Sequence, residues 1–355
     1  GALPGWQPDL VHGHDWQAGL VPAYLALNGG RRPATVMTVH NLAYQGLFPR
    51  HLLGELGLPE SSFQVEGVEF HGQIGFLKAG LFYADRLTTV SPTYAREIQD
   101  EEHGCGLHGL LRTRRGELAA ILNGIDRAVW DPASDRHLVA AYEPGDLDGK
   151  AANKAALQRR LGLTVRPGAP VIGVVSRLAP EKGLDLLLEV LPDLLEAGGQ
   201  LAMLIAGDAA LEEAYLAAAG AAPAEIGVQL GYDESLAHLI QAGADLTAVP
   251  SRTEPCGLTQ MYGMRYGALP LVARVGGLAD SVIDASMAAV DDGVATGFVF
   301  APVTADMLRR TLEHALDLYA DTAAWRRIVA RAMTRDFGWR RSAERYLALY
   351  RELAG

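Results

Sequence analysis

The stretch from Pro250 to Ala273 holds the residue types in this sequence that are best suited to chemistry. It reads PSRTEPCGLTQMYGMRYGALPLVA and joins a short apolar strand to a helix-like stretch. Glu254 stands just before that helix, where the positive helix end keeps a carboxylate ionised and able to accept hydrogen bonds from sugar hydroxyls. Unpaired N–H groups of the first turn could hold a phosphate, and Gly257 lets the backbone come close to a ligand. The alternative is a capping acid beside a buried thiol, since Cys256 has no neighbouring base in the sequence that would make it a nucleophile.

A second motif supplies positive charge. SRLAPEKG (176–183) follows a strand and opens a helix, with Arg177 and Lys182 five positions apart. A diphosphate leaving group gains negative charge as its bond breaks, so two cations and a helix N-terminus would stabilise it. An isolated Arg/Lys pair is more commonly a pair of solvated surface cations. The position at the end of a strand favours the phosphate-binding interpretation.

Polar residues also follow strands in the first part of the chain. HGHDWQAG (12–19) and TVHNLAYQG (38–46) contain His14, Asp15 and His40. These groups could together orient a sugar or stabilise an oxocarbenium-like centre, although for each histidine alone a hydrogen-bonded residue at the sheet rim is the favoured explanation. No third ligand cluster with metal spacing accompanies the H-x-H pattern, so we expect no metal.

Two glycine-rich stretches are interpreted differently. GCGLHG (104–109) fits the dinucleotide pattern G-x-G-x-x-G, but it follows a polar helical stretch instead of a strand, and we predict a loop. RVGGLAD (274–280) stands between a strand and a helix, where Gly276 and Gly277 would let a ligand or a facing loop come close.

The elements that position these residues alternate between short apolar strands and amphipathic helices. Continuous apolar runs indicate strands buried on both faces, and the helical stretches between them indicate parallel sheets. The strands are predicted at residues 9–14, 34–40, 85–91, 119–125, 170–176, 200–207, 227–232, 246–251, 269–273 and 297–300. Ligands of such sheets bind at the carboxyl ends of the strands, which is where the polar residues described above stand.

The predicted fold is an α/β protein of two Rossmann-like, doubly wound domains. The polar stretch 126–150 divides the chain between them. We predict an incomplete N-terminal domain at 1–125, a linker at 126–150, a C-terminal domain at 151–335 and a helix at 336–355 that packs back across either domain. The first domain shows about four strands where a doubly wound sheet usually has about five or six. The chain also starts without Met, so we expect the sequence to lack the beginning of that domain.

Charge and composition exclude some functions. The net charge of −11 argues against a nucleic-acid partner, because phosphate backbones are bound by basic surfaces. Two cysteines cannot form a disulfide framework and suit a reducing, cytoplasmic compartment, or a plastid if the source is a plant. No apolar run reaches the length of a membrane span, so we expect no membrane partner, and the sequence does not fix an oligomeric state.

Taken together, the motifs resemble those of bacterial-type glycogen synthases and plant starch synthases. The matching stretches, in the same order across nearly the whole chain, are HDWQAG, TVHNLAYQG, VSPTYAREI, LNGID, VVSRLAPEKGLDL, VPSRTEPCGLTQMYGMRYG and GGLADSV. The resemblance implies a GT-B glycosyltransferase that moves glucose from ADP-glucose to the non-reducing end of an α-1,4-glucan, with retention of configuration and without a metal or other cofactor. The family begins with a lysine- and glycine-containing loop that this sequence lacks, so weak or absent catalysis by this chain is one expectation.

The resemblance also implies roles for residues of the second domain. Arg177 and Lys182 would bind the ADP phosphates, and Glu254 would bind the hydroxyls of the donor glucose. The donor would also contact the backbone N–H groups of Cys256, Gly257, Leu258 and Thr259.

The remaining implied roles come from both domains. Tyr232 would stack on the adenine, His40 would face the sugar, and Asp15 and Asn123 would line the same site. No carboxylate is poised as a nucleophile, so a front-face transfer, in which the departing phosphate deprotonates the acceptor hydroxyl, fits better than a covalent intermediate. Two alternatives stay open: a related transferase that uses UDP-glucose, and an inactive fragment that only binds nucleotide or glucan.

Overall fold

The computed structural model describes residues 6–354 and divides into two compact units. The first unit contains the residues up to Asn123 together with those from Arg340 onward, and the second runs from Gly124 to Trp339. The chain therefore passes between the units twice, at 123–124 and at 339–340. None of the helices that the structure describes is long and apolar enough to cross a membrane.

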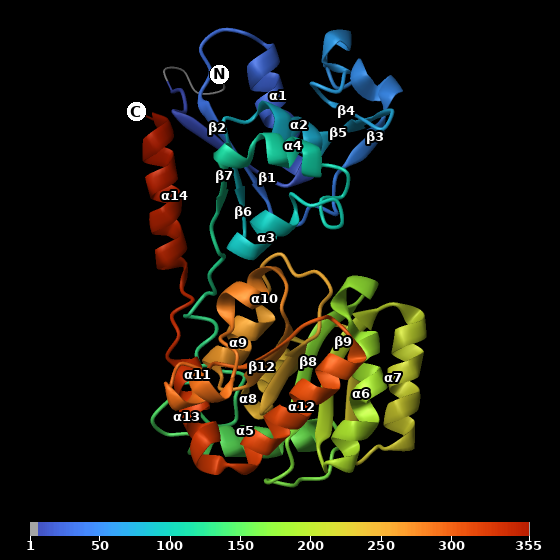
Figure 1. Ribbon diagram of the computed structural model, residues 1–355, viewed down its shortest axis with the longest axis vertical. Helices are drawn as coiled ribbons and strands as arrows, with labels where there is room; N and C mark the ends of the chain where they lie inside the picture. The colour runs from blue at the N-terminus through green and yellow to red at the C-terminus, as the bar shows by residue number, and fades with distance from the viewer. Residues whose placement is uncertain (1–5, 355) are drawn as a thin grey trace. The chain divides into compact units, whose positions relative to one another are not determined.

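The first unit is built on a parallel sheet of four strands (Figure 1). Its order is β1 (Leu10–His14), β2 (Ala34–Val39), β6 (Arg86–Thr89) and β7 (Leu118–Ala120). The four strands predicted in this half of the chain are confirmed, although β7 is shorter than predicted. The helices are α1 (Leu20–Leu27), α2 (Phe76–Tyr83), α3 (Pro92–Glu97), α4 (His108–Thr113) and, from the end of the chain, α14 (Trp339–Ala354).

Two local features of the first unit differ from the prediction. A small antiparallel sheet of β3 (Leu47–Pro49), β5 (Gln73–Gly75) and β4 (Glu69–Phe70) was not predicted, because strands of two or three residues are too short to show an alternating pattern. The stretch 104–109 turns through Cys105 and Gly106, with φ values of 47° and 80°, and α4 then begins at His108. The loop prediction was therefore wrong for the last two residues of that stretch.

The C-terminal helix α14 is attached to the first unit. The Ser342 hydroxyl donates a hydrogen bond of 2.5 Å to the Leu122 carbonyl. Further along the helix, the Tyr350 hydroxyl lies 2.6 Å from His12 Nδ1 on β1. The sequence left open which domain this helix covers, and these contacts assign it to the first.

The second unit is built on a parallel sheet of six strands. Its order is β10 (Ile226–Leu230), β9 (Gln200–Gly207), β8 (Val171–Leu178), β11 (Leu246–Val249), β12 (Leu269–Ala273) and β13 (Phe298–Phe300). All six strands were predicted. The chain adds strands on one side of β8 and then returns to its other side, so the order reverses between β8 and β11. Open sheets bind their ligands at this switch point.

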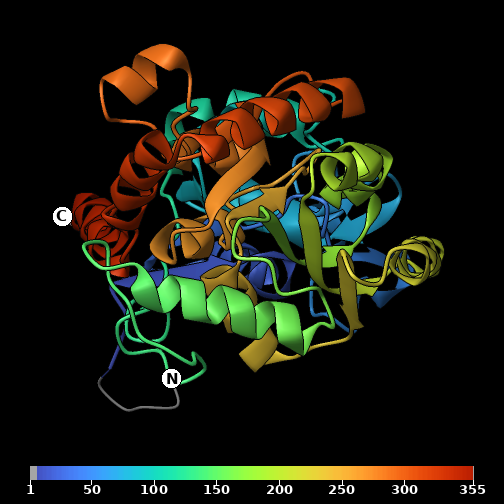
Figure 2. The ribbon, with the colours of Figure 1, turned by 90° about the horizontal axis from the view of Figure 1, so that it is seen from below.

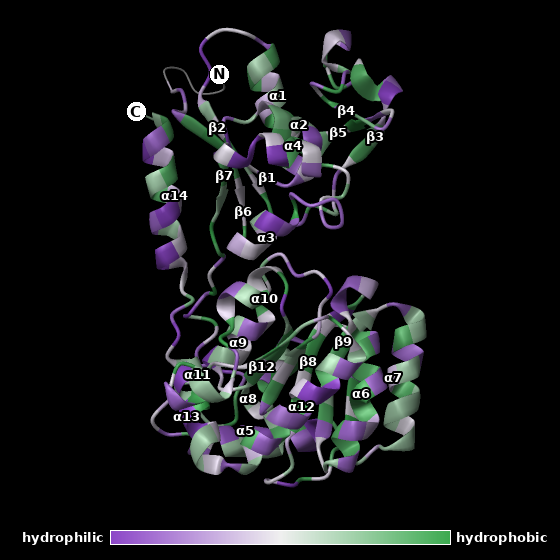
Figure 3. Cartoon of the chain, viewed as in Figure 1, coloured by the Kyte–Doolittle hydropathy of each residue, from purple (hydrophilic) through white to green (hydrophobic). Residues whose placement is uncertain are grey.

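Helices cover both faces of this sheet. On one face α5 (Asp148–Arg160) packs against α8 (Glu234–Gly243), and on the other α6 (Leu184–Glu196) packs against α12 (Ala305–Ala320). Figure 2 shows α5, in green, and α12, in orange-red, on opposite sides of the strands. The strands carry mostly the hydrophobic colour in Figure 3, whereas the outer side of α12 is hydrophilic. The remaining helices are α7 (Ala209–Ala221), α9 (Thr259–Arg265), α10 (Gly276–Ser281), α11 (Met287–Asp291) and α13 (Thr322–Met333).

The segment that precedes α5 is part of the second unit and is not a free linker. The Trp130 ring stacks between the rings of His238 and Tyr262, with centroids 3.8 Å from each. The Tyr142 hydroxyl donates a 2.8 Å hydrogen bond to the Tyr266 carbonyl and is buried. The predicted linker at 126–150 was therefore wrong, because two aromatic side chains within a polar stretch anchor it to α8 and α9.

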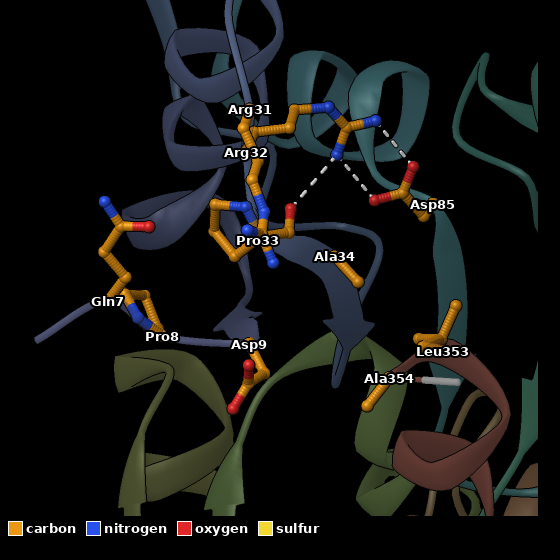
Figure 4. Close-up of a pocket in the computed structure, with 10 residues that line it drawn as sticks. All are labelled: Gln7, Pro8, Asp9, Arg31, Arg32, Pro33, Ala34, Asp85, Leu353 and Ala354. Carbon is orange, nitrogen blue, oxygen red and sulfur yellow. Dashed lines mark hydrogen bonds and ion pairs between the residues drawn. The ribbon is translucent and has the colours of Figure 1, made fainter.

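A hollow of about 570 Å³ lies at the amino ends of β1 and β2. Figure 4 shows Arg32 reaching across it to the carboxylate of Asp85, with Arg31 beside it. This hollow is at the opposite end of the strands from the polar residues that the sequence singled out.

Candidate functional site

The carboxyl ends of β8 and β11 bring together a cation and a carboxylate. Lys182 follows β8 in a short 3-10 helix (Pro180–Lys182), and Glu254 follows β11. Lys182 Nζ lies 2.7 Å from Glu254 Oε2, and the Ser251 hydroxyl donates to the same oxygen at 2.9 Å. Their side chains are only 19% and 11% exposed. The switch point of the second sheet therefore carries a partly buried ion pair.

Glycines allow the loops around this ion pair to pack backbone against backbone. A Cβ at Gly183 would lie 2.1 Å from the Pro250 carbonyl oxygen. At Gly276 and Gly277 a Cβ would lie 2.0 Å from the carbonyl oxygens of Glu254 and Cys256, respectively. The Gly277 N–H donates a 3.0 Å hydrogen bond to the Glu254 carbonyl. These two glycines thus accommodate a facing loop, one of the two partners that the sequence suggested.

The turn before α9 is also held in a defined shape. Gly257 has a φ of 66°, a left-handed conformation that glycine adopts without strain. The Gln260 amide donates to the carbonyls of Cys256 and Gly257 and to the Ser281 hydroxyl. The residues that precede α9 and α6, Leu258 and Gly183, do not cap these helices with a side chain.

A cavity of about 50 Å³ connects these residues and has room for about one or two water molecules. Its lining includes the predicted residues Lys182, Glu254, Gly257, Leu258 and Thr259. It also includes Ser251 and Gln260, which the sequence interpretation missed because neither has a charge or a motif of its own. The only signal for Ser251 was its position three residues before Glu254.

Arg177 and Tyr232 lie outside this cavity. Arg177, near the end of β8, is 62% exposed at its side chain, and its Nη2 lies 3.7 Å from Glu181 Oε1. Tyr232 follows β10 at the edge of the sheet and is 87% exposed. Tyr232 stands beyond the carboxyl end of its strand, whereas Arg177 is the last but one residue of β8. In the part of the chain described, no contact joins either residue to Lys182. Their roles stay predictions.

In the first unit, the predicted residues at the carboxyl ends of β1 and β2 form a cluster. His14 Nδ1 lies 3.0 Å from His40 Nε2, and Asp15 Oδ1 accepts the His40 backbone N–H at 2.7 Å. Asp15 has a φ of 55°, which costs a non-glycine residue about 1–3 kcal/mol. Asn123 is half-buried in the segment after β7, and its role stays a prediction.

Two histidines at this end of the sheet, His14 and His12, have lowered pKa values. Burial lowers the pKa of His14, and the neighbouring His40 lowers it further. His12 stacks on His14 with centroids 4.3 Å apart, and its pKa falls to about 4, first because of burial and then because of the two other histidines. A neutral imidazole can donate one hydrogen bond and accept another, as a group that orients a substrate must. His12 was visible in the H-x-H pattern but was not predicted as a site residue.

Two known families match the chain. Residues 1–113 match the family described as starch synthase catalytic domain, and residues 161–331 match the glycosyl transferases group 1. The two matches fall in the first and the second structural unit, respectively.

Individual relatives match almost the whole chain. A glycogen synthase from Rhodopseudomonas palustris is 56% identical over 353 residues, which is 99% of this chain and 73% of the relative. A glycogen synthase from Serratia proteamaculans is 54% identical over 98% of this chain and 73% of its own length.

Solved structures agree with the sequence comparison. The catalytic domain of starch synthase IV from Arabidopsis thaliana has a TM-score of 0.91 and 35% identity, covering 99% of this chain and 74% of that one. A sucrose-phosphate synthase from Thermosynechococcus elongatus, at 19% identity and a TM-score of 0.62, shares the fold; it covers 97% of this chain and 73% of that one. Both predictions, of a GT-B fold and of the family, are confirmed: the chain belongs to the glycogen synthase and starch synthase family of glycosyltransferases.

Proposed function

We propose that the chain transfers glucose from ADP-glucose to the non-reducing end of an α-1,4-glucan, with retention of configuration and without a metal in the reaction. The observation that carries the proposal is the Lys182–Glu254 pair of 2.7 Å at the switch point of the second sheet. A nucleotide sugar needs both charges: a cation for its diphosphate and an acceptor for its hydroxyls. The starch synthase from Arabidopsis thaliana was solved bound to ADP and acarbose, which supports a nucleotide and a glucan as ligands of this chain as well.

Lys182 is assigned to the diphosphate. As the bond between the anomeric carbon and the phosphate oxygen breaks, its electron pair stays on ADP and the β-phosphate gains negative charge. An ammonium that is only 19% exposed interacts with this charge more strongly than a solvated one would. Arg177, on the same strand end, is assigned to the same diphosphate; its exposed side chain is free to reorient.

Glu254 is assigned to the hydroxyls of the donor glucose. Its carboxylate already accepts hydrogen bonds from Lys182 and Ser251 through Oε2, which fixes its orientation. The backbone N–H groups from Cys256 to Thr259 are assigned to the donor as well, beside a helix start that the preceding residue, Leu258, does not cap with its side chain.

The transfer is proposed to occur on one face of the sugar. The acceptor hydroxyl oxygen forms the new bond to the anomeric carbon on the side from which ADP leaves, and its proton passes to the departing β-phosphate. Configuration is retained and no covalent glucosyl-enzyme forms. A glucosylated peptide found by mass spectrometry after rapid quenching would contradict this step.

A transfer assay with glycogen as primer tests the proposal. Labelled ADP-glucose and UDP-glucose are compared at equal concentration, and kcat/KM is measured for each. We expect transfer from ADP-glucose with kcat/KM higher by at least about tenfold. A preference for UDP-glucose would contradict the assigned donor, and ADP binding without any transfer would indicate a chain that only binds its ligands.

A further inference from the structure

Three potential metal ligands gather in the second unit, away from the residues assigned to the transfer. They are His137, in the segment before α5, and Glu234 and His238, both on α8. One ring nitrogen of each histidine and one carboxylate oxygen of Glu234 lie within 4.8 Å of one another. Glu234 and His238 are four residues apart on a helix, so their side chains project from the same face.

Asp135 contacts the ring of His238 and the backbone of His137. Its Oδ2 lies 2.6 Å from His238 Nδ1 and accepts the Tyr266 hydroxyl at 2.6 Å, while Oδ1 accepts the His137 backbone N–H at 2.8 Å. A carboxylate hydrogen-bonded to one ring nitrogen of a histidine is the arrangement that commonly orients the other nitrogen toward a metal.

The other nitrogen of His238 has no partner. His238 is 1% exposed, and Nε2 is a buried atom without a hydrogen bond to any residue that the structure describes. When Nδ1–H donates to a carboxylate, Nε2 carries a lone pair, which is the form of imidazole that binds a metal. A buried polar atom without a hydrogen bond lowers the stability of the fold, and a ligand that binds this lone pair would remove that cost.

We propose that His137, Glu234 and His238 bind a zinc-like divalent cation, with water as the fourth ligand. Two histidines and one glutamate form a ligand set that zinc uses, and tetrahedral zinc would bring the ligand atoms to about 3.4 Å from each other. Glu234 is exposed and can rotate to close the remaining distance. The ion would fasten the segment before α5 onto α8, and it takes no part in glucose transfer.

Zinc titration of the full chain after treatment with a chelator tests the site. We expect one Zn²⁺ per chain by calorimetry, a higher Tm with Zn²⁺, and a Co²⁺ complex with a tetrahedral visible spectrum. His137→Ala and Glu234→Gln are each expected to weaken Zn²⁺ binding at least tenfold. His51→Ala, which removes an exposed histidine of the first unit, is the matched control and should bind Zn²⁺ like the parent chain.

Two results would overturn the proposal: no stoichiometric binding of Zn²⁺ by the parent chain, or unchanged binding in both variants. Glu234→Gln changes an exposed side chain, so it decides the question if His137→Ala does not fold. Transfer activity should be the same with and without Zn²⁺, which separates this site from the proposed function.

Discussion

In each parallel sheet, an aspartate stands just before one strand and binds both the backbone of the neighbouring strand and a cation. In the first unit, Asp85 precedes β6, its Oδ2 accepts the Thr35 N–H at 2.8 Å, and Arg32 binds its carboxylate. In the second, Asp245 precedes β11, its Oδ2 accepts the Val171 N–H at 2.8 Å, and Lys154 lies 2.7 Å away. Each aspartate also donates its own N–H to the carbonyl of that same neighbouring residue.

The two arrangements differ in burial. The side chains of Arg32 and Asp85 are 32% and 30% exposed, whereas those of Lys154 and Asp245 are 8% and 11% exposed. Water screens the first pair and hardly reaches the second. The same hydrogen-bond geometry should therefore contribute very differently to the stability of the two units.

The opposite ends of the sheets differ as well. The second unit places an ion pair, Lys182 and Glu254, at its carboxyl ends, and the first unit places the imidazole rings of His14 and His40 there. An ammonium group suits the binding of a diphosphate, whereas imidazole rings suit hydrogen bonding to hydroxyl groups. The comparison suggests that the second unit supplies the electrostatic part of the proposed reaction.

The largest effect is expected for Asp245→Asn, on the free energy of unfolding. The substitution leaves Lys154 as a buried charge without its partner, which costs about 3–5 kcal/mol. Urea denaturation should show this loss in the free energy of unfolding. Asp317→Asn, at an exposed position of α12, is the control, and a loss below about 1 kcal/mol for Asp245→Asn would contradict the role of burial.

The second largest effect is expected for Glu254→Gln, on the rate of glucose transfer. The amide keeps the shape of the side chain but loses the charge that the sugar hydroxyls and Lys182 need. We expect kcat for glucose transfer to fall on the order of 10²-fold. Glu213→Gln on the exposed side of α7 should retain full activity. Equal activity of the two variants would remove Glu254 from the site.

A smaller effect is expected for Asp85→Asn. The hydrogen bond from Arg32 is the main reason that the pKa of Asp85 is lowered from 3.8 to about 2. The stability from this shift is present above pH 3.8 and is lost as the pH falls through about 2. Since the pair is partly exposed, we expect the substitution to cost about 1 kcal/mol at neutral pH. A cost equal to that of Asp245→Asn would contradict the comparison of the two pairs.

The smallest effect is expected for His12, on the pH dependence of stability. Its pKa is lowered from 6.5 to about 4, so the unfolded chain takes up a proton more readily than the folded one. The contribution of neutral His12 to the free energy of unfolding is fully present above pH 6.5 and is lost as the pH falls toward about 4. The Tm of the parent chain should decrease more over this range than the Tm of His12→Gln. Parallel curves for the two proteins would show that His12 does not carry this dependence.

Much of the architecture could be predicted because long parallel strands have a clear sequence pattern. The ten strands of the two parallel sheets were predicted from apolar runs, and the positions of Lys182 and Glu254 after two of them placed both residues at the same rim. Strands β3, β4 and β5 were missed because two or three residues carry no pattern. The linker prediction at 126–150 rested on the polar composition of this segment, although Trp130 and Tyr142 anchor it.

The parts of the site that could not be predicted depend on contacts between distant segments. Gln260 orders the turn at Cys256 and Gly257 through its side chain, which a spacing argument does not reveal. His137 and His238 are far apart in the sequence, and they meet where Asp135 contacts the backbone of one and the ring of the other. Sequence motifs therefore located the rim of the sheet, and the structure identified the residues that support it.

Calorimetric titration of ADP is the most direct test of the central claim, that the Lys182–Glu254 rim of the second unit holds the nucleotide. The parent chain is compared with Lys182→Gln and with Arg310→Gln, which removes an exposed cation of α12. Because a hydrogen bond to a charged group contributes about 1.5–3 kcal/mol, Lys182→Gln should weaken ADP binding by at least about tenfold, and Arg310→Gln should leave it unchanged. Equal affinity of the parent chain and Lys182→Gln would contradict the account.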